Sequence, residues 1–251
     1  MEGNHPQKPT RAKHRILHVD AQPIFCQGFA KLLDEQSDLH LQICGHAVDA
    51  NTAFAALEKL KPEMLILDLS LLGANGIELI KMIKARFEQL PILVLTELDE
   101  LDYGERAMRA GANGYVMKQV SVDEVMRAIR DVLRGGTYLS KRLQSRIVQK
   151  FFGGYSALPS PEVEALTDRE IEIFSLIGQG FKTKDIGARL RVSVKTVETH
   201  RAHIKEKLKL KDGMELVRRA VRWVDDRERH HRALPPEAGA TPFRDLPTDP
   251  Q

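Results

Sequence analysis

Four polar side chains stand at the ends of short apolar runs that have the length of β-strands: Asp20, Asp68, Thr96 and Lys118. The carboxyl ends of parallel strands meet at one edge of a sheet, so these side chains are expected to converge there. Carboxylate oxygens can hold Mg²⁺, and a hydroxyl and an ammonium can meet the charge of a phosphoryl group on Asp68. The set predicts a phosphoacceptor site, although any one aspartate alone would be read as a surface loop residue.

The elements that must position these residues alternate along the first half of the chain. Apolar runs occupy residues 16–19, 41–44, 64–67, 92–95 and 115–117, and segments with helical spacing of apolar residues lie between them. This alternation predicts an α/β doubly wound parallel sheet with helices on both faces. The third and fourth runs are almost continuously apolar, which places these two strands in the middle of the sheet.

Four stretches resemble the receiver domain of bacterial two-component response regulators, over about residues 14–136. They are residues 15–20 (RILHVD), 65–76 (LILDLSLLGANG), 92–96 (ILVLT) and 111–118 (GANGYVMK). The fold that this resemblance implies is a flavodoxin-like sheet of five parallel strands in the order 2-1-3-4-5.

The resemblance also implies a role for each residue at the predicted edge. Asp68 would be the phosphoacceptor, and a sensor histidine kinase would be the partner that supplies the phosphoryl group. The side chains that would contact the phosphoryl group or switch with it are Thr96, Tyr115 and Lys118. The implied cofactor is Mg²⁺, with ligands from Asp20, Asp68 and the backbone carbonyl of Ser70.

Three positions depart from the receiver pattern. Ala21 stands where the family has a second acid that touches the metal, and alanine has no oxygen to offer. Glu97 stands where the family has a small residue, and it adds bulk and negative charge where the phosphoryl donor approaches. Leu72 replaces the usual proline. We therefore expect weak Mg²⁺ binding and slow or absent phosphorylation; the alternative is that Asp20, Asp68 and water still hold the ion.

The second half of the chain is organised differently. Residues 137–165 read as a linker that contains a helix over 139–152, followed by Gly153-Gly154 and by Pro159 and Pro161. Residues 166–228 have helical spacing and form a separate all-α domain. Residues 1–13 and 229–251 lack periodicity and are expected to be disordered; His230-His231 in that tail is a weak metal-site candidate, for which a solvated tail is the simpler interpretation.

Residues 166–228 carry the signals of a helix-turn-helix. Thr167 and Glu170 form a capping-box pattern at the first helix, the second helix opens near Thr183, and Ser193 is the expected N-cap of a third helix over 194–208. In such a motif the helix after the tight turn enters the major groove of DNA.

At about 100° per residue, one narrow sector of this third helix is apolar and must face the core. It contains Val197, Ile204 and Leu208, with His200 at its edge as a structural histidine. The opposite, exposed side is expected to meet DNA, with lysines and Arg201 positioning the domain on phosphates. The candidate DNA-binding residues are Lys182, Thr183, Lys184, Ser193, Lys195, Thr196, Glu198, Thr199, Arg201, Ala202 and Lys205, and Lys207, Lys209 and Lys211 are further candidates for phosphate contact.

The same stretch resembles the DNA-binding domain of the LuxR/FixJ (NarL-type) family. The resemblance rests on residues 166–170 (LTDRE), 177–180 (IGQG), 184–186 (KDI) and 193–200 (SVKTVETH) and on Leu190, Ile204, Lys207 and Leu208. It implies a fourth helix over about 213–224 that pairs two copies on DNA, so a homodimer is expected. The apolar stripe of that helix is expected to be Val217, Ala220, Val221 and Val224.

Composition and charge fit two domains with different partners. The chain has 251 residues and a net charge of +3, but residues 14–136 carry 13 Lys and Arg against 18 Asp and Glu, and residues 166–230 carry 16 against 11. A basic helical half favours nucleic acid. Two cysteines without zinc spacing, no signal peptide and no apolar run of membrane-spanning length predict a cytoplasmic protein with no membrane partner.

These features together predict a DNA-binding transcriptional regulator of the two-component type that is not an enzyme. One alternative is a phosphorylation-independent interaction and dimerisation regulator. A second is an aspartyl-phosphate phosphatase, which would need an acid two residues after Asp68, where this chain has Ser70.

Overall fold

The computed structural model describes residues 14–35, 40–71, 75–152 and 163–233. This part of the chain forms two compact units, one built around a sheet and one helical. Residues 1–13, residues 234–251 of the tail expected over 229–251, Leu72, Gly153, Gly154 and the two linker prolines lie outside the described residues.

The sheet unit contains five parallel strands in the order β2-β1-β3-β4-β5, which confirms the predicted topology. The strands are β1 (His14–Val19), β2 (Leu41–Ala47), β3 (Met64–Leu67), β4 (Ile92–Thr96) and β5 (Gly114–Met117). Every residue of β3 and β4 is buried, as the continuous apolar runs indicated. The middle of the sheet is therefore the core of this unit.

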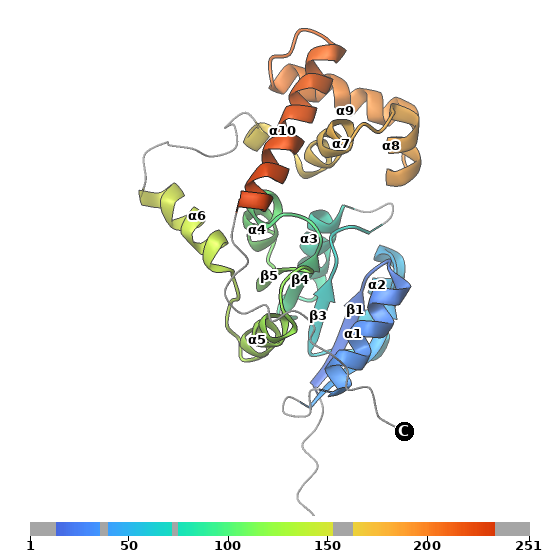
Figure 1. Cartoon of the computed structure of the whole chain (residues 1–251). Helices are drawn as coiled ribbons and strands as arrows, with labels where there is room; N and C mark the ends of the chain where they lie inside the picture. Colours follow the sequence, from blue (N-terminus) through green and yellow to red (C-terminus); the bar gives the residue numbers. More distant parts are fainter. Residues whose placement is uncertain (1–13, 36–39, 72–74, 153–162, 234–251) are drawn as a thin grey trace, which may run out of the picture. The chain divides into compact units, whose positions relative to one another are not determined.

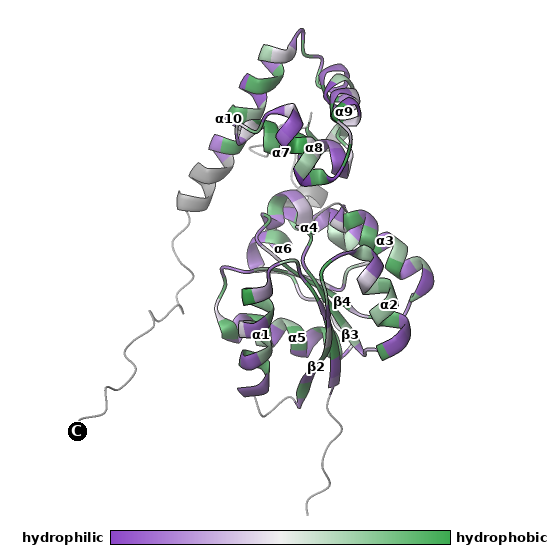
Figure 2. Cartoon of the chain, turned by 90° about the vertical axis from the view of Figure 1, so that its right-hand side faces the viewer, coloured by the Kyte–Doolittle hydropathy of each residue, from purple (hydrophilic) through white to green (hydrophobic). Residues whose placement is uncertain are grey.

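Helices cover both faces of the sheet (Figure 2). Helices α1 (Pro23–Glu35) and α5 (Val122–Leu133) lie on one side, and α2 (Ala50–Leu60) and α3 (Gly76–Arg86) lie on the other. Phe29 and Leu33 of α1 and Ile129 of α5 pack with the strand residues Ile16 and Ile66 in one buried apolar cluster. Helix α4 (Glu100–Arg109) connects β4 to β5.

The edge pair of strands carries an irregularity that sequence periodicity does not reveal. Ile16 pairs with Ile43, but Leu17 pairs with Gly45 and His18 with His46, because the register shifts by one residue after Ile16. Strand β2 is accordingly longer than the expected 41–44. A bulge of this kind changes the face of the sheet to which every following side chain points.

The helix expected over 139–152 is α6 (Lys141–Phe152), and it packs on the sheet unit. Leu143 is fully buried, and Arg142 Nη1 lies 3.5 Å from Asp99 Oδ2 beside the start of α4. Val148 shares the helical apolar spacing of Leu143 and Ile147, yet it is 53% exposed, whereas Arg146 is buried. The periodicity was misleading here because the face of a helix that packs is decided by its neighbour.

The described part of the helical unit starts at the short 3₁₀ helix η2 (Val163–Ala165) and contains four α-helices (Figure 1). They are α7 (Asp168–Gly178), α8 (Thr183–Leu190), α9 (Val194–Lys207) and α10 (Gly213–Ala233). The expected capping box of Thr167 and Glu170 is present at α7, and Ser193 caps α9 by accepting a hydrogen bond from the Thr196 amide.

Helix α10 differs from its prediction in length, and only part of its expected apolar stripe is buried. It runs to Ala233 and not to about 224, so part of the expected tail is helical; no glycine or proline interrupts the sequence between Gly213 and Pro235. Its buried residues are Leu216, Ala220 and Trp223, and the Trp223 ring lies 5.5 Å from that of Phe174. Val217 and Val221 of the expected stripe are exposed.

Candidate phosphoacceptor site and nucleic-acid interface

The structure brings together the four polar residues that the sequence placed at strand ends. Asp20 follows β1, Asp68 follows β3, Thr96 ends β4 and Lys118 follows β5. Backbone hydrogen bonds hold these ends in place, since the Asp68 amide donates to the Val19 carbonyl and the Lys118 amide donates to the Thr96 carbonyl. Asp20, Asp68 and Thr96 are all buried.

Asp68 receives hydrogen bonds on both carboxylate oxygens. The Thr96 hydroxyl donates to Oδ1 over 2.6 Å, and the Ser70 amide donates to the same oxygen over 2.9 Å. Lys118 Nζ lies 2.8 Å from Oδ2. A carboxylate with donors on both oxygens has its negative charge well compensated inside the fold.

Lys118 also contacts the second carboxylate, a pairing that the sequence did not indicate. Its Nζ lies 2.7 Å from Asp20 Oδ2 and stands 4.2 Å from the centre of the Phe25 ring. Burial alone would lower the pKa of Lys118, but the hydrogen bonds to Asp20 and Asp68 outweigh it and raise the pKa. The ammonium therefore stays charged between the two acids.

The Asp20 side chain is completely buried. Burial raises the pKa of its carboxyl, although Lys118 and the Gln22 amide, which donates to Oδ1 over 2.7 Å, act in the opposite direction. Ala21 contributes no ligand atom from its side chain. The exposed Glu97, which follows β4, accepts a long hydrogen bond of 3.5 Å from the side chain of Gln22, which follows β1.

Tyr115, the expected partner of Thr96, is fully buried. Its hydroxyl donates to the Leu98 carbonyl over 3.0 Å. Burial raises the pKa of this hydroxyl well above its ordinary value, so the group remains a neutral hydrogen-bond donor. Thr96 is the last residue of β4, and Tyr115 donates to Leu98 in the loop that follows, so both residues border this loop.

His18 is a buried polar residue near this edge that the sequence did not single out. Its Nε2 lies 3.8 Å from Asp20 Oδ2, and its ring contacts those of Phe25 and Phe29. Burial, with smaller contributions from the charges of His46 and Lys118, lowers the pKa of His18 to about 3. The only sequence signal was a histidine within an otherwise apolar strand.

In the helical unit, α9 presents the two faces that its sequence predicted. Val197, Ile204 and Leu208 are buried, and His200 is half-buried. The exposed face contains Lys195, Thr196, Glu198, Thr199, Ala202 and His203. Arg201 and Lys205 lie at its flanks and are partly exposed.

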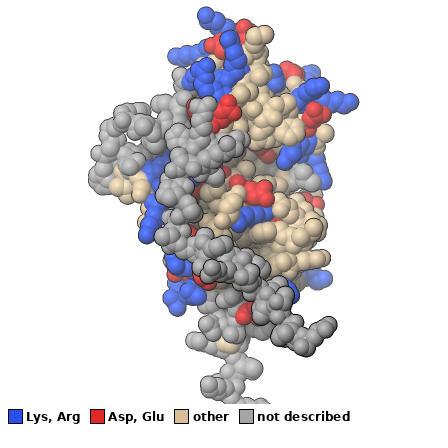
Figure 3. Space-filling model, viewed as in Figure 1, with Lys and Arg blue, Asp and Glu red and all other residues tan. Residues whose placement is uncertain are grey.

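The other candidate DNA contacts surround this face. Lys182 and Lys184 are exposed at the start of α8, where Thr183 is partly exposed, and Ser193 is exposed at the start of α9. Figure 3 shows Lys and Arg side chains gathered on the helical unit. Lys207, a further candidate for phosphate contact, instead donates from Nζ to Glu170 Oε2 over 2.7 Å and so links α9 to α7.

Two family models match the chain, one for each unit. Residues 16–130 match the response regulator receiver domain, and residues 164–220 match the luxR family of bacterial regulatory proteins. The oxygen regulatory protein NreC of Staphylococcus aureus (strain bovine RF122 / ET3-1) is 34% identical over 212 residues, which cover 83% of this chain and 97% of that protein.

The chain belongs to the LuxR family of two-component response regulators. Its members are DNA-binding regulators and are not typically enzymes. NreC of Staphylococcus haemolyticus (strain JCSC1435) is likewise 34% identical and is covered to 97%. Within the described residues, every helix is too short or too polar to cross a membrane.

Solved structures similar to this chain agree with its membership of the LuxR family of response regulators. RcsB from Salmonella enterica serovar Typhimurium, bound to promoter rprA with the phosphomimetic BeF3⁻, is 25% identical, with a TM-score of 0.58 over 85% of this chain and 98% of that one. A LuxR family response regulator from Aurantimonas sp. SI85-9A1 is 28% identical, with a TM-score of 0.52 over 56% of this chain and 99% of that one.

Proposed function

We propose that this response regulator binds double-stranded promoter DNA as a homodimer through α9. The exposed polar face of α9 supports the proposal, because its apolar side is fully used in packing within the helical unit. RcsB, which shares this architecture, is described in complex with promoter DNA. Regulation of transcription follows from such binding at a promoter.

In this proposal the residues of the interface divide into two groups. Glu198, Thr199 and Ala202 lie on the exposed face of α9, from which side chains can reach base edges in the major groove. The phosphate contacts come from the starts of α8 and α9 and from the flanks of the α9 face, and the residues are Lys182, Thr183, Lys184, Ser193, Lys195, Thr196, Arg201 and Lys205.

Selection of bound fragments from a random-sequence DNA library, followed by titration of the enriched sequence at several salt concentrations, tests this proposal. We expect one enriched motif with two half-sites, and an affinity that falls steeply as salt rises, because phosphate contacts release counterions. Absence of an enriched motif, or an affinity that does not change with salt, would contradict it.

We further propose that Asp68 is the phosphoacceptor and that its use is impaired. A sensor histidine kinase would donate the phosphoryl group: the N–P bond to the donor histidine breaks as the O–P bond to Asp68 forms. Thr96 and Lys118 already hydrogen-bond to the Asp68 carboxylate, so they are placed to contact the transferred group. Thr96 and Tyr115 would then act as the switch pair.

The residues at this edge suit Mg²⁺ in kind but are one acid short in number. Asp20, Asp68 and the Ser70 carbonyl would hold the ion, and Ala21 offers no side-chain oxygen. When bound, Mg²⁺ neutralises charge on the phosphoryl group. The pairing of Lys118 with both carboxylates supports weak Mg²⁺ binding, because the ammonium competes with the ion for the same oxygens.

Calorimetric titration of the full chain with Mg²⁺, in comparison with Ala21→Asp, tests this part. We expect the added carboxylate to tighten binding by at least about tenfold, or roughly 1.4 kcal/mol. Equal affinities would show that the missing acid does not limit Mg²⁺ binding.

If Asp68 is never modified, the receiver acts as a phosphorylation-independent interaction and dimerisation module.

A further inference from the structure

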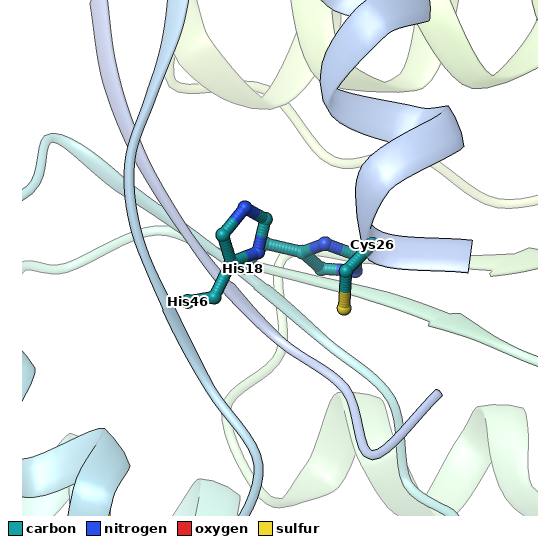
Figure 4. A group of neighbouring side chains, drawn as sticks. All are labelled: His18, Cys26 and His46. Carbon is teal, nitrogen blue, oxygen red and sulfur yellow. The ribbon is translucent and has the colours of Figure 1, made fainter. Parts of the chain in front are cut away.

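Three side chains able to bind a transition metal lie together beside the phosphoacceptor edge and are distinct from the ligands proposed for Mg²⁺. His18 comes from β1, His46 from β2 and Cys26 from α1 (Figure 4). One ligand atom from each lies within 4.8 Å of the other two. His18 and Cys26 are buried and His46 is exposed, so the group opens to solvent on the side of β2.

The bulge in the edge strands creates this group. With an unshifted register after Ile16, His18 would pair with Gly45, and His46 would point to the opposite face of the sheet. The extra residue in β2 instead pairs His18 directly with His46, and their rings lie 5.7 Å apart. Cys26, in the first turn of α1, completes the group above this face.

The His18 imidazole lacks the partners that a buried polar ring needs. The side chain is completely buried, and neither ring nitrogen has a hydrogen-bond partner among the described residues. The neighbouring rings of Phe25 and Phe29 offer no acceptor, and the His46 ring, centred 5.7 Å away, forms no hydrogen bond with His18. Buried nitrogens are normally satisfied, so an orphaned imidazole next to a thiol and a second imidazole indicates a ligand that belongs there.

The surrounding charge favours a cation. Asp20 and Asp68 lie close by and together carry two negative charges, against the single positive charge of Lys118. The Asp20 carboxylate lies beside the His18 ring, at 3.8 Å from Nε2. Carboxylates next to a ligating histidine are a common outer layer of metal sites.

We propose that His18, Cys26 and His46 bind one Zn²⁺ ion, with water in the fourth position. Two imidazoles and one thiolate are soft and borderline donors that suit zinc and not Mg²⁺, which prefers oxygen. The ligand atoms of a tetrahedral zinc ion lie about 3.3–3.8 Å apart, so the group must contract slightly. The exposed His46 side chain is free to make most of that movement.

Zinc binding would change the bond that Cys26 now makes. Its thiol donates a weak hydrogen bond, 3.7 Å long, to the Asp20 carbonyl. The thiol would lose its proton to solvent and the sulfur would bind the ion, so each zinc bound releases one proton. The ion would then join β1, β2 and α1 at the edge of the sheet.

Another group of potential ligands, Glu170, His200 and His203, is less suitable. Its carboxylate already accepts hydrogen bonds from Lys207 and from the Thr167 amide in the α7 capping box. His203→Ala is therefore a useful control, because it removes that alternative without touching the proposed site.

The test uses the full chain with His230 and His231 replaced by alanine, so that this histidine pair near the end of α10 cannot contribute. Titration with Co²⁺, a spectroscopic substitute for Zn²⁺, should give one equivalent of bound metal with a sulfur-to-cobalt charge-transfer band. Zn²⁺ should abolish the band, release about one proton per ion and raise the melting temperature. A large excess of Mg²⁺ should leave the band unchanged.

Cys26→Ser should abolish the band, and His46→Ala, which alters an exposed side chain, should weaken Zn²⁺ binding at least about 100-fold. Cys44→Ser and His203→Ala should bind zinc as the parent does, with circular dichroism confirming that all variants are folded. A parent chain that binds no zinc at micromolar concentration would overturn the proposal. So would zinc binding that survives both Cys26→Ser and His46→Ala.

Discussion

Lys118 Nζ lies 2.8 Å from Asp68 Oδ2, and the same ammonium lies 2.7 Å from Asp20 Oδ2. The buried Lys118 ammonium therefore balances the charges of both Asp20 and Asp68. At this edge of the sheet, Ala21 stands where receivers have a second metal-binding acid. The Lys118 contact connects stability with the proposed function, because Mg²⁺ in the proposed site would share these carboxylate oxygens with Lys118.

Lys118→Ala should destabilise the sheet unit and also improve Mg²⁺ binding. Removing one partner of a buried ion pair leaves uncompensated charge, so we expect the free energy of unfolding to fall by about 3 kcal/mol in EDTA. Added Mg²⁺ should restore part of this loss, because the ion replaces the ammonium. Urea unfolding with and without Mg²⁺ measures both effects.

The matched control is Lys81→Ala, which removes an exposed ion pair with Glu78 on α3. It should change stability by less than about 1 kcal/mol, with no response to Mg²⁺. If Lys118→Ala behaved like Lys81→Ala, the ammonium would not be the cation that balances Asp20 and Asp68.

Glu170 should make the helical unit sensitive to acid. Burial alone would raise the pKa of this carboxyl, but hydrogen bonds from Lys207 and Thr167 outweigh it and lower the pKa below 4.5. A lowered carboxyl pKa stabilises the fold fully above pH 4.5, and that stabilisation is lost as the pH falls through the folded-state value. Glu170→Gln should be less stable at pH 7 and should lose less stability on acidification.

Thermal unfolding between pH 7 and pH 3, followed by the fluorescence of the single tryptophan, Trp223, measures this effect. Glu198→Gln on the exposed face of α9 is the control and should leave the profile unchanged. Parallel profiles for Glu170→Gln and the parent would show that the bond to Lys207 contributes no pH-dependent stability.

Two substitutions on α9 should separate phosphate contact from base recognition. Lys195→Ala should weaken binding to all DNA sequences and reduce the slope of log affinity against log salt by about 1. Thr199→Ala should change the preference among bases by about 1–3 kcal/mol with little effect on that slope. Lys31→Ala, on the exposed side of α1, should bind DNA as the parent does. A sequence-selective effect of Lys195→Ala would contradict its assignment to phosphate.

Gly178→Ala should destabilise the helical unit. A β-carbon at this position would overlap the Ala220 carbonyl and the Val224 side chain, so α7 and α10 would have to separate. The Ala220 carbonyl belongs to the backbone and cannot move aside as a flexible side chain can. We therefore expect the free energy of unfolding to fall by about 1–3 kcal/mol. Gly213→Ala, at the open start of α10, should be neutral because no atom lies within 4 Å of its added methyl. Equal stabilities of the two variants would refute the close packing at Gly178.

The periodicity of apolar residues and the positions of the strand ends predicted the centre of the sheet, the residues at its edge and the faces of α9. The continuous apolar runs of β3 and β4 located the centre of the sheet, and the convergence of parallel strand ends brought Asp20, Asp68, Thr96 and Lys118 together. The faces of α9 followed from the 3.6-residue repeat alone.

The features that were missed depend on contacts between distant residues. The pairing of His18 with His46 requires the bulge in β2, which no local pattern marks. The exposure of Val148 follows from the way α6 packs on α4, and the burial of Trp223 follows from the packing of α10 on α7. These features depend on tertiary contacts, so the periodicity of a single sequence carries no information on them.

The most direct test of the central claim is the stoichiometry of Asp68 phosphorylation. The full chain, Ala21→Asp and Asp68→Ala would be incubated with acetyl phosphate and millimolar Mg²⁺ and analysed by intact mass, with DNA affinity measured on the same samples. We predict little modification of the parent, at least about tenfold more of Ala21→Asp, and none of Asp68→Ala. Stoichiometric, Asp68-dependent phosphorylation of the parent, with a matching change in DNA affinity, would contradict the account.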